Sequence, residues 1–320
     1  MITSFLKSVF KTLPPVRRHL QRVDALVGER DRLTRELETY KKDERARLKE
    51  RKAQHSAHSR ANGPTSRLVP PIAPVPNHLN LTVSDWIAHQ VKAEPYWFQK
   101  IEVLPGLFSA GWNDPAVQKL PWYGLPEDLT GMRVLDIGCA EGFFSFEAER
   151  RGAREVIGID SYPESIRRFN IVKAARQSNC SAFLMNVYDL EPRRLGTFDL
   201  VLFYGVFYHL RHPQLALERI RSICSGTFLF QTHITTEPSL QGVPWARYYP
   251  HGMMSGTDQE LWDPTVFWLF NGTCCTAMFD HVGFTNIEVI SDDPAPFVAR
   301  AEVPNPTPGV PPDWAEAPWC

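Results

Sequence analysis

One stretch, residues 133–153, constrains the fold of this chain more than any other. A short apolar run, interrupted only by Asp136, leads into a turn that contains Gly138 and Gly142. A helical pattern follows the second glycine, and Gly152 stands where such a helix would end. Strand, glycine turn and helix in this order open a nucleotide-binding βαβ unit, so the stretch predicts an α/β fold. Glycine is expected there because it can take a positive φ and lets the backbone pass close under a ligand.

Acidic residues around this turn indicate which kind of nucleotide it would hold. The next predicted strand, residues 155–159, ends at Asp160, where a carboxylate can accept hydrogen bonds from ribose hydroxyls. A dinucleotide site would have a second glycine where this chain has Ala140, and its turn would bind a pyrophosphate. Here the turn carries Glu141, which together with Asp136 suits a cationic sulfonium and an amino-acid tail. The alternative is that Asp136 only caps or pairs locally.

These residues carry a resemblance. Residues 134–142, 158–160, 186–190 and 198–210 resemble the class I S-adenosylmethionine-dependent methyltransferases. The Gly-Val-Phe-Tyr-His segment at residues 205–209 is also similar to the tRNA wobble-uridine 5-oxyacetate methyltransferases and their uncharacterised relatives. The resemblance implies a Rossmann-like, seven-stranded, mostly parallel sheet with helices on both faces, and S-adenosylmethionine as cofactor.

The resemblance also implies which residues bind the cofactor. Asn186 stands where the family usually has an acid that accepts from the adenine amino group, and an Asn carbonyl can accept as well. Val187 would offer its backbone N–H and an apolar wall to the ring. The full set expected at the cofactor is Asp136, Gly138, Cys139, Ala140, Glu141, Gly142, Asp160, Ser161, Asn186, Val187 and Tyr204.

Two histidines are candidate general bases for methyl transfer to a hydroxyl or amine. His209 and His233 each follow a predicted central strand, and an imidazole pKa near 6.5 suits proton removal at neutral pH. The alternative for His209 is that it caps the following helix or packs against the adenine pocket. Tyr208, Arg247 and Tyr248 are the predicted contacts of the acceptor substrate.

The second half of the domain is predicted in less detail. Residues 236–263 lack clear periodicity and hold several aromatic residues, so they are expected to form a loop that covers the acceptor. Residues 265–282 are predicted to be helical, and residues 286–290 and 297–302 to be the last two strands, paired as a hairpin-like edge.

Charge is unevenly distributed along the 320 residues. The net charge of −1 gives no bulk preference for nucleic acid or membrane. Residues 1–62 hold sixteen Lys and Arg against eight Asp and Glu, a balance of +8, so the remainder carries −9. A basic arm on an acidic enzyme domain is therefore expected, and the arm could contact tRNA phosphates or an anionic membrane.

The basic part is predicted to be a helical arm, residues 1–53. Within it, residues 1–13 are amphipathic and fit peripheral contact with a membrane surface, or docking on a partner or on the chain itself. Residues 16–53 carry a partial 3.5-residue apolar seam, which fits a coiled-coil homodimer or a single solvated helix. The other predicted boundaries are a Pro- and Ser-rich linker at 54–80, the methyltransferase domain at 81–303 and a disordered Pro-rich tail at 304–320.

Six cysteines show neither CxxC pairs nor histidines at metal spacing, so no metal site is predicted. The cysteine pattern is typical of a reduced, cytoplasmic protein. No apolar run reaches the length of about 18 residues that a transmembrane helix needs, and no secretory signal is expected.

The sequence favours methyl transfer from S-adenosylmethionine to a hydroxyl, or another heteroatom, of a small-molecule, sugar or lipid-linked acceptor. One alternative is a tRNA wobble-uridine (carboxy)methyltransferase, and another is a scaffold that acts through its N-terminal arm. Relatives that use a carboxylated cofactor carry a Lys-Gly-Pro stretch and an arginine directly after Tyr-His. This chain has Leu104-Pro105-Gly106 and Leu210 there, and a buried carboxylate without a cation would be costly. Ordinary S-adenosylmethionine is therefore expected.

Overall fold

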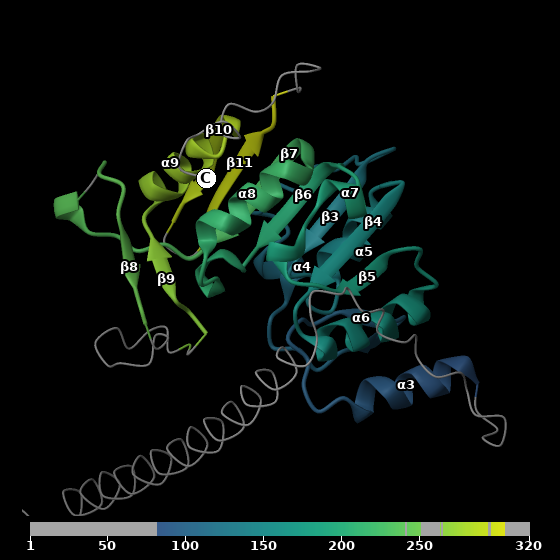
Figure 1. Ribbon diagram of the computed structural model, residues 1–320. Coiled ribbons are helices and arrows are strands. Elements are labelled where there is room, and N and C mark those ends of the chain that lie inside the picture. Colours follow the sequence, from purple (N-terminus) through teal and green to yellow (C-terminus); the bar gives the residue numbers. More distant parts are fainter. Residues whose placement is uncertain (1–81, 241, 251–262, 264, 294–295, 305–320) are drawn as a thin grey trace, which may run out of the picture. The chain divides into compact units, whose positions relative to one another are not determined.

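The computed structural model describes residues 82–240, 242–250, 263, 265–293 and 296–304 (Figure 1). All of them belong to one compact unit, Ser66–Cys320. The predicted arm (1–53), with its membrane contact and its dimer, lies outside the described residues, as do the linker (54–80) and the tail beyond Pro304. These remain predictions. No described helix combines the length and the apolar character that crossing a bilayer requires.

Helices and strands alternate along most of the described chain. In order they are α3 (Val83–Ala93), β1 (Glu102–Leu104), β2 (Leu107–Phe108), α4 (Pro115–Gln118), β3 (Arg133–Ile137), α5 (Phe143–Arg150), β4 (Glu155–Asp160), α6 (Pro163–Arg176), β5 (Ser181–Leu184), η1 (Val187–Asp189), α7 (Pro192–Leu195), β6 (Phe198–Tyr204), η2 (Phe207–His209), α8 (Pro213–Ile223), β7 (Cys224–Thr232), η3 (Pro238–Leu240), β8 (Ala246–Tyr248), β9 (Trp268–Phe270), α9 (Gly272–His281), β10 (Thr285–Asp292) and β11 (Phe297–Glu302). Elements labelled η are 3₁₀ helices.

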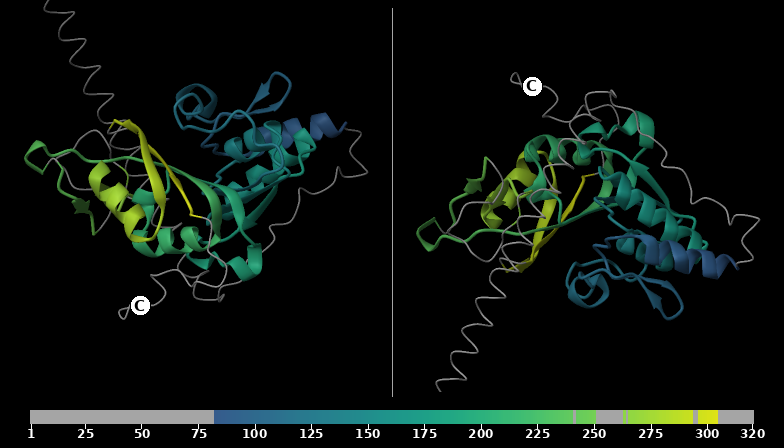
Figure 2. Two further views of the ribbon diagram at one scale, coloured as in Figure 1. Left: turned by 90° about the horizontal axis from the view of Figure 1, so that it is seen from above. Right: turned by 90° about the horizontal axis from the view of Figure 1, so that it is seen from below.

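A seven-stranded sheet forms the centre of the unit, in the order β10-β11-β7-β6-β3-β4-β5. Strands β3 to β7 are parallel, whereas β11 is antiparallel to both of its neighbours. This confirms the predicted sheet and its hairpin at one edge. Both views of Figure 2 show the yellow β10–β11 hairpin on one side of the sheet and the blue segment with α3 on the other. The chain order reverses between β3 and β6, which is where open α/β sheets bind ligands.

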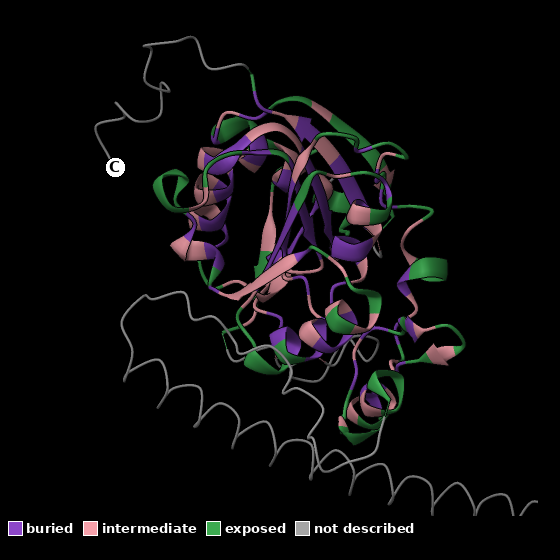
Figure 3. Cartoon of the chain, turned by 90° about the vertical axis from the view of Figure 1, so that its right-hand side faces the viewer, coloured by how far each residue is buried: buried purple, intermediate pink, exposed green. Residues whose placement is uncertain are grey.

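Helices cover both faces of the sheet because successive strand residues point to opposite sides. Leu135 and Phe203 face a core built with α8 and α9, whereas Val134 and Leu202 face a core built with α3, α5 and α6. All four side chains are fully buried, and each stabilises the fold by about 1.5–3 kcal/mol through removal from water. Figure 3 shows the central strands of the sheet as the most continuously buried part of the unit.

Two predictions for the region after β7 were wrong in part. Residues 236–263 are not simply a loop, since they contain η3 and strand β8, which pairs antiparallel with β9 (Figure 1). The helix predicted for residues 265–282 begins only at Gly272, because the aromatic and apolar residues of β9 pair with β8 first. Asn271 marks the change: its side chain accepts a hydrogen bond from the Cys274 N–H and caps the helix.

Candidate cofactor and acceptor site

The turn after β3 packs directly against the segment that follows β6. Gly138 has a φ of +73°, and a Cβ at this position would lie 2.3 Å from Cγ2 of Val206. Gly142 has a φ of +95° and caps α5, and a Cβ there would lie 2.5 Å from Cδ2 of Phe169. Both glycines are therefore required by the packing of the chain itself. The close approach to a ligand that their presence suggested in the sequence is not needed to explain them.

Asp160, at the end of β4, is tied to the same turn. Its carboxylate accepts hydrogen bonds from the N–H of Ala140 (3.0 Å) and of Tyr162 (2.8 Å). The bond helps to hold Ala140 at a φ of +49°, a conformation that costs a non-glycine residue about 1 kcal/mol. Burial raises the pKa of Asp160 to about 6, against these two hydrogen bonds, which favour the carboxylate. Each carboxylate oxygen has a second lone pair that a ribose hydroxyl could use.

Glu141 has a different role from the one expected. Its side chain is fully buried and its Oε1 accepts hydrogen bonds from the Phe98 N–H (2.9 Å) and from Nε of Arg168 (3.0 Å). Its Oε2 accepts from the Gln99 N–H (3.0 Å). Both oxygens are therefore occupied by groups of the chain. The geometry favours a carboxylate that fixes the segment before β1 to the turn, in place of direct contact with the amino-acid tail of a cofactor.

A further hydrogen bond, between the start of α5 and the side chain of Gln99, also joins the turn to the segment before β1. The side-chain Oε1 of Gln99 accepts a hydrogen bond from the Phe143 N–H (3.1 Å), one of the free amides at the start of α5. Gln99 is itself buried. Segment and turn thus hold each other, although more than 40 residues separate them in the chain.

Asp136 and Cys139 lie inside the fold beside the turn. The Asp136 carboxylate is buried and accepts a hydrogen bond from Oγ of Ser145 at 2.6 Å. Burial raises its pKa to about 6, which the Ser145 hydrogen bond opposes and the nearby Asp160 reinforces. Cys139 packs against Gly158 of β4, where an added Cβ would lie 2.9 Å from its Sγ. The local pairing considered for Asp136 is thus present, with Ser145 as the partner.

The other predicted cofactor residues differ in exposure and in hydrogen bonding. Ser161 is exposed beside Asp160, and Val187 is buried at the start of η1. Asn186 caps η1, since its Oδ1 accepts from the Tyr188 N–H at 3.1 Å, and this oxygen keeps a second lone pair that could accept from an adenine amino group. Tyr204 is buried, and its hydroxyl donates to the carbonyl of Tyr123 at 2.9 Å. Its side chain belongs to the core beneath α5, so direct contact with a cofactor through the hydroxyl is not supported.

Both candidate bases pack against the ring of the same tyrosine. The ring centroid of Tyr208 is 4.2 Å from that of His209 and 5.0 Å from that of His233. Burial lowers the pKa of His209, and the Asp263 carboxylate opposes this shift. Burial, the positive charge that His209 can carry and Lys119 all lower the pKa of His233. Both imidazoles are therefore neutral at pH 7 and able to accept a proton.

His209 is held by residues that the sequence did not single out. Its Nδ1 lies 2.9 Å from Oγ1 of Thr265 and 3.1 Å from the Thr265 carbonyl oxygen. Oγ1 of Thr265 in turn donates to Oδ1 of Asp263 at 2.6 Å. By contrast, Nδ1 of His233 is buried and has no hydrogen-bond partner among the described residues.

Of the predicted acceptor contacts, only Tyr208 lies beside the histidines. Arg247 and Tyr248 are exposed on β8, and the Tyr248 ring packs at 4.5 Å from that of Trp268. Their neighbour Tyr249 packs with Tyr208 against a small apolar cluster, and its buried hydroxyl has no partner among the described residues. Tyr249 therefore shares a packing cluster with Tyr208, whereas Tyr248 is exposed.

Lys119, which the sequence analysis did not consider, supplies a cation to this region. Its Nζ lies 5.3 Å from the ring centroid of Phe98, whose N–H binds Glu141. Burial lowers its pKa to about 8. Within the described residues it has no carboxylate at ion-pair distance, yet it is close enough to His233 to lower the pKa of that imidazole. The described part of the chain therefore offers a cation near His233, whereas the preference for ordinary S-adenosylmethionine stays a prediction.

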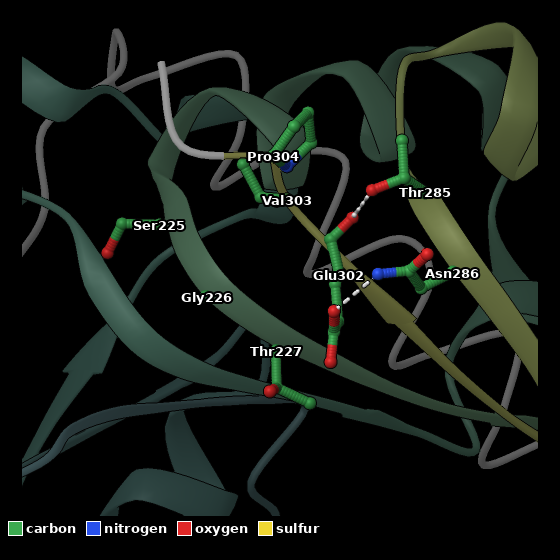
Figure 4. A pocket seen from close by; sticks show the side chains of 8 residues that line it. All are labelled: Ser225, Gly226, Thr227, Thr285, Asn286, Glu302, Val303 and Pro304. Carbon is green, nitrogen blue, oxygen red and sulfur yellow. Dashed lines mark hydrogen bonds between the residues drawn. The ribbon is translucent and has the colours of Figure 1, made fainter. Parts of the chain in front are cut away.

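The cavity in Figure 4 lies away from this site, at the opposite ends of the parallel strands. It has a volume of about 410 Å³ and is lined by the start of β7, the start of β10 and the end of β11. Its polar groups are paired within the chain, as in the hydrogen bond from Nδ2 of Asn286 to Glu302. No cluster of described residues could hold a metal ion, and the described cysteines are free thiols.

Residues 113–289, more than half of the chain, match a protein family described as a methyltransferase domain. The chain belongs to this family. With its seven-stranded sheet and its glycine turn, it is a class I S-adenosylmethionine-dependent methyltransferase by family and fold.

Among curated proteins, this methyltransferase is similar to tRNA U34 carboxymethyltransferases. It is 33% identical over 130 residues to the one from Cellvibrio japonicus, which covers 40% of this chain and 38% of the relative. It is also 33% identical over 164 residues to the one from Geobacter sp., which covers 50% of this chain and 47% of the relative. The chain thus spans about half, or less, of the length of these relatives.

Among solved structures, the methyltransferase is similar to the N-terminal domain of EvdMO1, crystallised in the presence of S-adenosylhomocysteine and D-fucose. The TM-score is 0.54, with 20% identity over 70% of this chain and 98% of that domain. At this identity the likeness supports the fold, and the seven-stranded sheet predicted from the sequence agrees with it.

Proposed function

We propose that this chain transfers a one-carbon group from an S-adenosylmethionine-type donor to a hydroxyl oxygen. The observation that carries the proposal is the pair of histidines whose rings pack against Tyr208, in the segment after β6 that also places Val206 against Gly138. A neutral imidazole can remove the proton of a hydroxyl, which needs such a base before it can attack carbon efficiently. A scaffold that acts through its N-terminal arm would not require a proton acceptor at this position.

The residues around the turn fit the cofactor of this family. Asp160 keeps lone pairs for the ribose hydroxyls, the second lone pair of Asn186 Oδ1 could accept from the adenine amino group, and Val187 could offer the ring an apolar wall. When bound, S-adenosylmethionine supplies a methyl group on a positively charged sulfur, and that sulfur leaves as a neutral thioether. The chain's own task is to align the acceptor oxygen with this carbon and to take up the proton that the hydroxyl loses.

The acceptor with most support is a tRNA that carries uridine at position 34. Support comes from the names of the relatives and from Lys119, a cation close to His233 that could neutralise a carboxylate on the transferred group. The basic balance of residues 1–62 adds a segment that could contact phosphates.

A small-molecule, sugar or lipid-linked acceptor is the second candidate. It is favoured by the charge of residues 63–320, which is −9 and would repel the phosphates of a polynucleotide around the site. It is also favoured by the inward-facing hydroxyl of Tyr249, which has no partner among the described residues and could bind a polar group of a compact acceptor.

The test begins with the full-length chain, purified from its host, and the small molecule that accompanies it, identified by mass spectrometry. Transfer is then measured with S-adenosylmethionine and with its carboxylated form, using tRNA that is unmodified at position 34 or a panel of hydroxylated metabolites. Modified tRNA nucleosides, absent with the Asp160→Ala variant, would support the tRNA proposal. A modified metabolite with unchanged tRNA would support the second candidate. A bound nicotinamide nucleotide would refute both.

Cofactor affinity should weaken as the pH falls below about 6, because burial raises the pKa of Asp160 to about 6. Below that pH the carboxyl is protonated and loses an acceptor site, so affinity for S-adenosylhomocysteine should fall by up to about tenfold per pH unit. Isothermal titration calorimetry between about pH 8 and pH 5.5 measures this. Asp160→Asn should bind more weakly, with a flat profile. A profile that persists in this variant would assign the titration to Asp136, whose pKa burial also raises to about 6.

A further inference from the structure

We propose that Asp263 and Thr265 fix His209 in the tautomer that carries its proton on Nδ1, so that Nε2 is the atom that accepts the proton of the acceptor hydroxyl. The inference rests on the proposed function and names the base within it. Asp263 and Thr265 act through His209 and are therefore positioning residues.

The assignment follows from counting protons. The Thr265 hydroxyl has one proton, and Oγ1 lies 2.6 Å from a carboxylate oxygen of Asp263, which can only accept when ionised. With its proton committed to Asp263, Oγ1 can only accept from Nδ1 of His209, 2.9 Å away. The Thr265 carbonyl oxygen, 3.1 Å from the same nitrogen, can never donate. Two acceptors thus face Nδ1, which must carry the proton and leave a lone pair on Nε2.

Other hydrogen bonds keep this arrangement in place. Oδ1 of Asp263 also accepts from the Thr265 N–H at 2.8 Å, which closes a tight turn before β9. The next residues are fixed to η2, since the Phe267 N–H donates to the carbonyl of Tyr208 at 2.8 Å. Residues 56 positions apart in the chain are thereby brought together, and Nδ1 of His209 is held at the turn.

The same reasoning distinguishes the two candidate bases. Nδ1 of His233 is buried without a partner among the described residues, so none of them fixes the tautomer of that ring through this nitrogen. Burial lowers the pKa of both imidazoles. His209 and Lys119 lower the pKa of His233 further, which Asp263 opposes, whereas at His209 both Asp263 and the Thr265 backbone oppose the effect of burial. A base must become positively charged when it takes a proton, so His209 is the better placed of the two.

Nitrogen NMR of the histidine rings tests the inference directly. The full-length chain is labelled with ¹⁵N in its imidazoles, and long-range ¹H–¹⁵N spectra are recorded at about pH 8, where the rings are neutral. The His209→Gln variant identifies the signals of His209 by their loss. We expect one signal of a protonated Nδ1 and one of an unprotonated Nε2. A proton found on Nε2 would overturn the inference, even if the chain transfers the one-carbon group.

Variants then connect the tautomer to turnover. Thr265→Val keeps the backbone carbonyl but loses one acceptor, and should lower kcat about tenfold with little change in the KM of the acceptor. Thr265→Ser should restore both kcat and the spectrum. Thr276→Val, on α9, removes a hydroxyl that bonds only to helix carbonyls and serves as the matched control. A kcat for Thr265→Val equal to that of the control would refute the positioning role, whereas the expected spectrum in a chain without any transfer would refute the proposed function instead.

Discussion

Replacing Glu141 with alanine should lower the free energy of unfolding by about 3–5 kcal/mol, the range found when one partner of a buried ion pair is removed. The carboxylate is fully buried and accepts from Arg168 and from the backbone N–H groups of Phe98 and Gln99. Without it, a buried guanidinium and two buried amides lose their acceptor. Among the carboxylates of the described residues, Arg168 then keeps only a contact with Glu94 at 4.0 Å. Urea unfolding of the full-length chain, followed by circular dichroism, measures the loss.

Two further variants make this result interpretable. Glu141→Gln keeps the shape and one acceptor oxygen, but turns an NH₂ group toward a donor, and should cost about 1–3 kcal/mol. Glu155→Gln changes a half-exposed carboxylate that pairs with Arg133, and should cost no more than about 1 kcal/mol. If Glu141→Ala unfolds at the same urea concentration as Glu155→Gln, the role assigned to Glu141 is wrong.

Replacing His209 with alanine should lower the turnover number by about 10²- to 10⁴-fold, the usual contribution of a positioned general base. The affinity for S-adenosylhomocysteine should change little, because the contacts predicted for the cofactor come from Asp160 and the turn after β3. Calorimetry for binding and mass spectrometry for product formation separate the two effects.

Two histidine variants accompany this measurement. His281→Ala, exposed at the end of α9, removes an imidazole far from Tyr208 in the chain and should leave turnover unchanged. His233→Ala should lower turnover less than His209→Ala. The opposite order would assign the role of base to His233 and would contradict the choice made from the hydrogen bonds of Thr265.

The central sheet could be predicted because its signals are local. The apolar runs of β3 and β6, the glycine turn and Asp160 lie within short stretches of sequence. Each of these elements can be recognised from its own residues alone. Parallel strands buried on both faces are continuously apolar, which is a strong pattern. The seven strands and their hairpin edge were therefore correct.

The role of Glu141 could not be predicted in the same way. A carboxylate next to a glycine in a ligand-binding turn suggests an exposed contact. Its partners are backbone amides more than 40 residues away, and backbone amides leave no trace in the identity of the residues that carry them. The contacts of Thr265 and Asp263 with His209 could not be predicted for a related reason, since only folding brings these residues together.

Short elements gave the remaining errors. Strands β8 and β9 have three residues each, which is too few for an alternating pattern to be distinguished from a loop or from the first turn of a helix. Among the residues around β8, the predicted contact Tyr248 is exposed, whereas its neighbour Tyr249 packs against the same small apolar cluster as Tyr208.

The hydrogen bonds of Glu141 also couple the motions of two regions. Residues 98 and 99 can separate from the domain only if their N–H groups break their hydrogen bonds to the Glu141 carboxylate. The start of α5 then also loses its hydrogen bond to the side chain of Gln99. Local opening of one region is therefore opening of the other, as in a cooperative unit of hydrogen exchange. A ligand that stabilises the turn after β3 will therefore slow amide hydrogen exchange at Phe98 and Gln99.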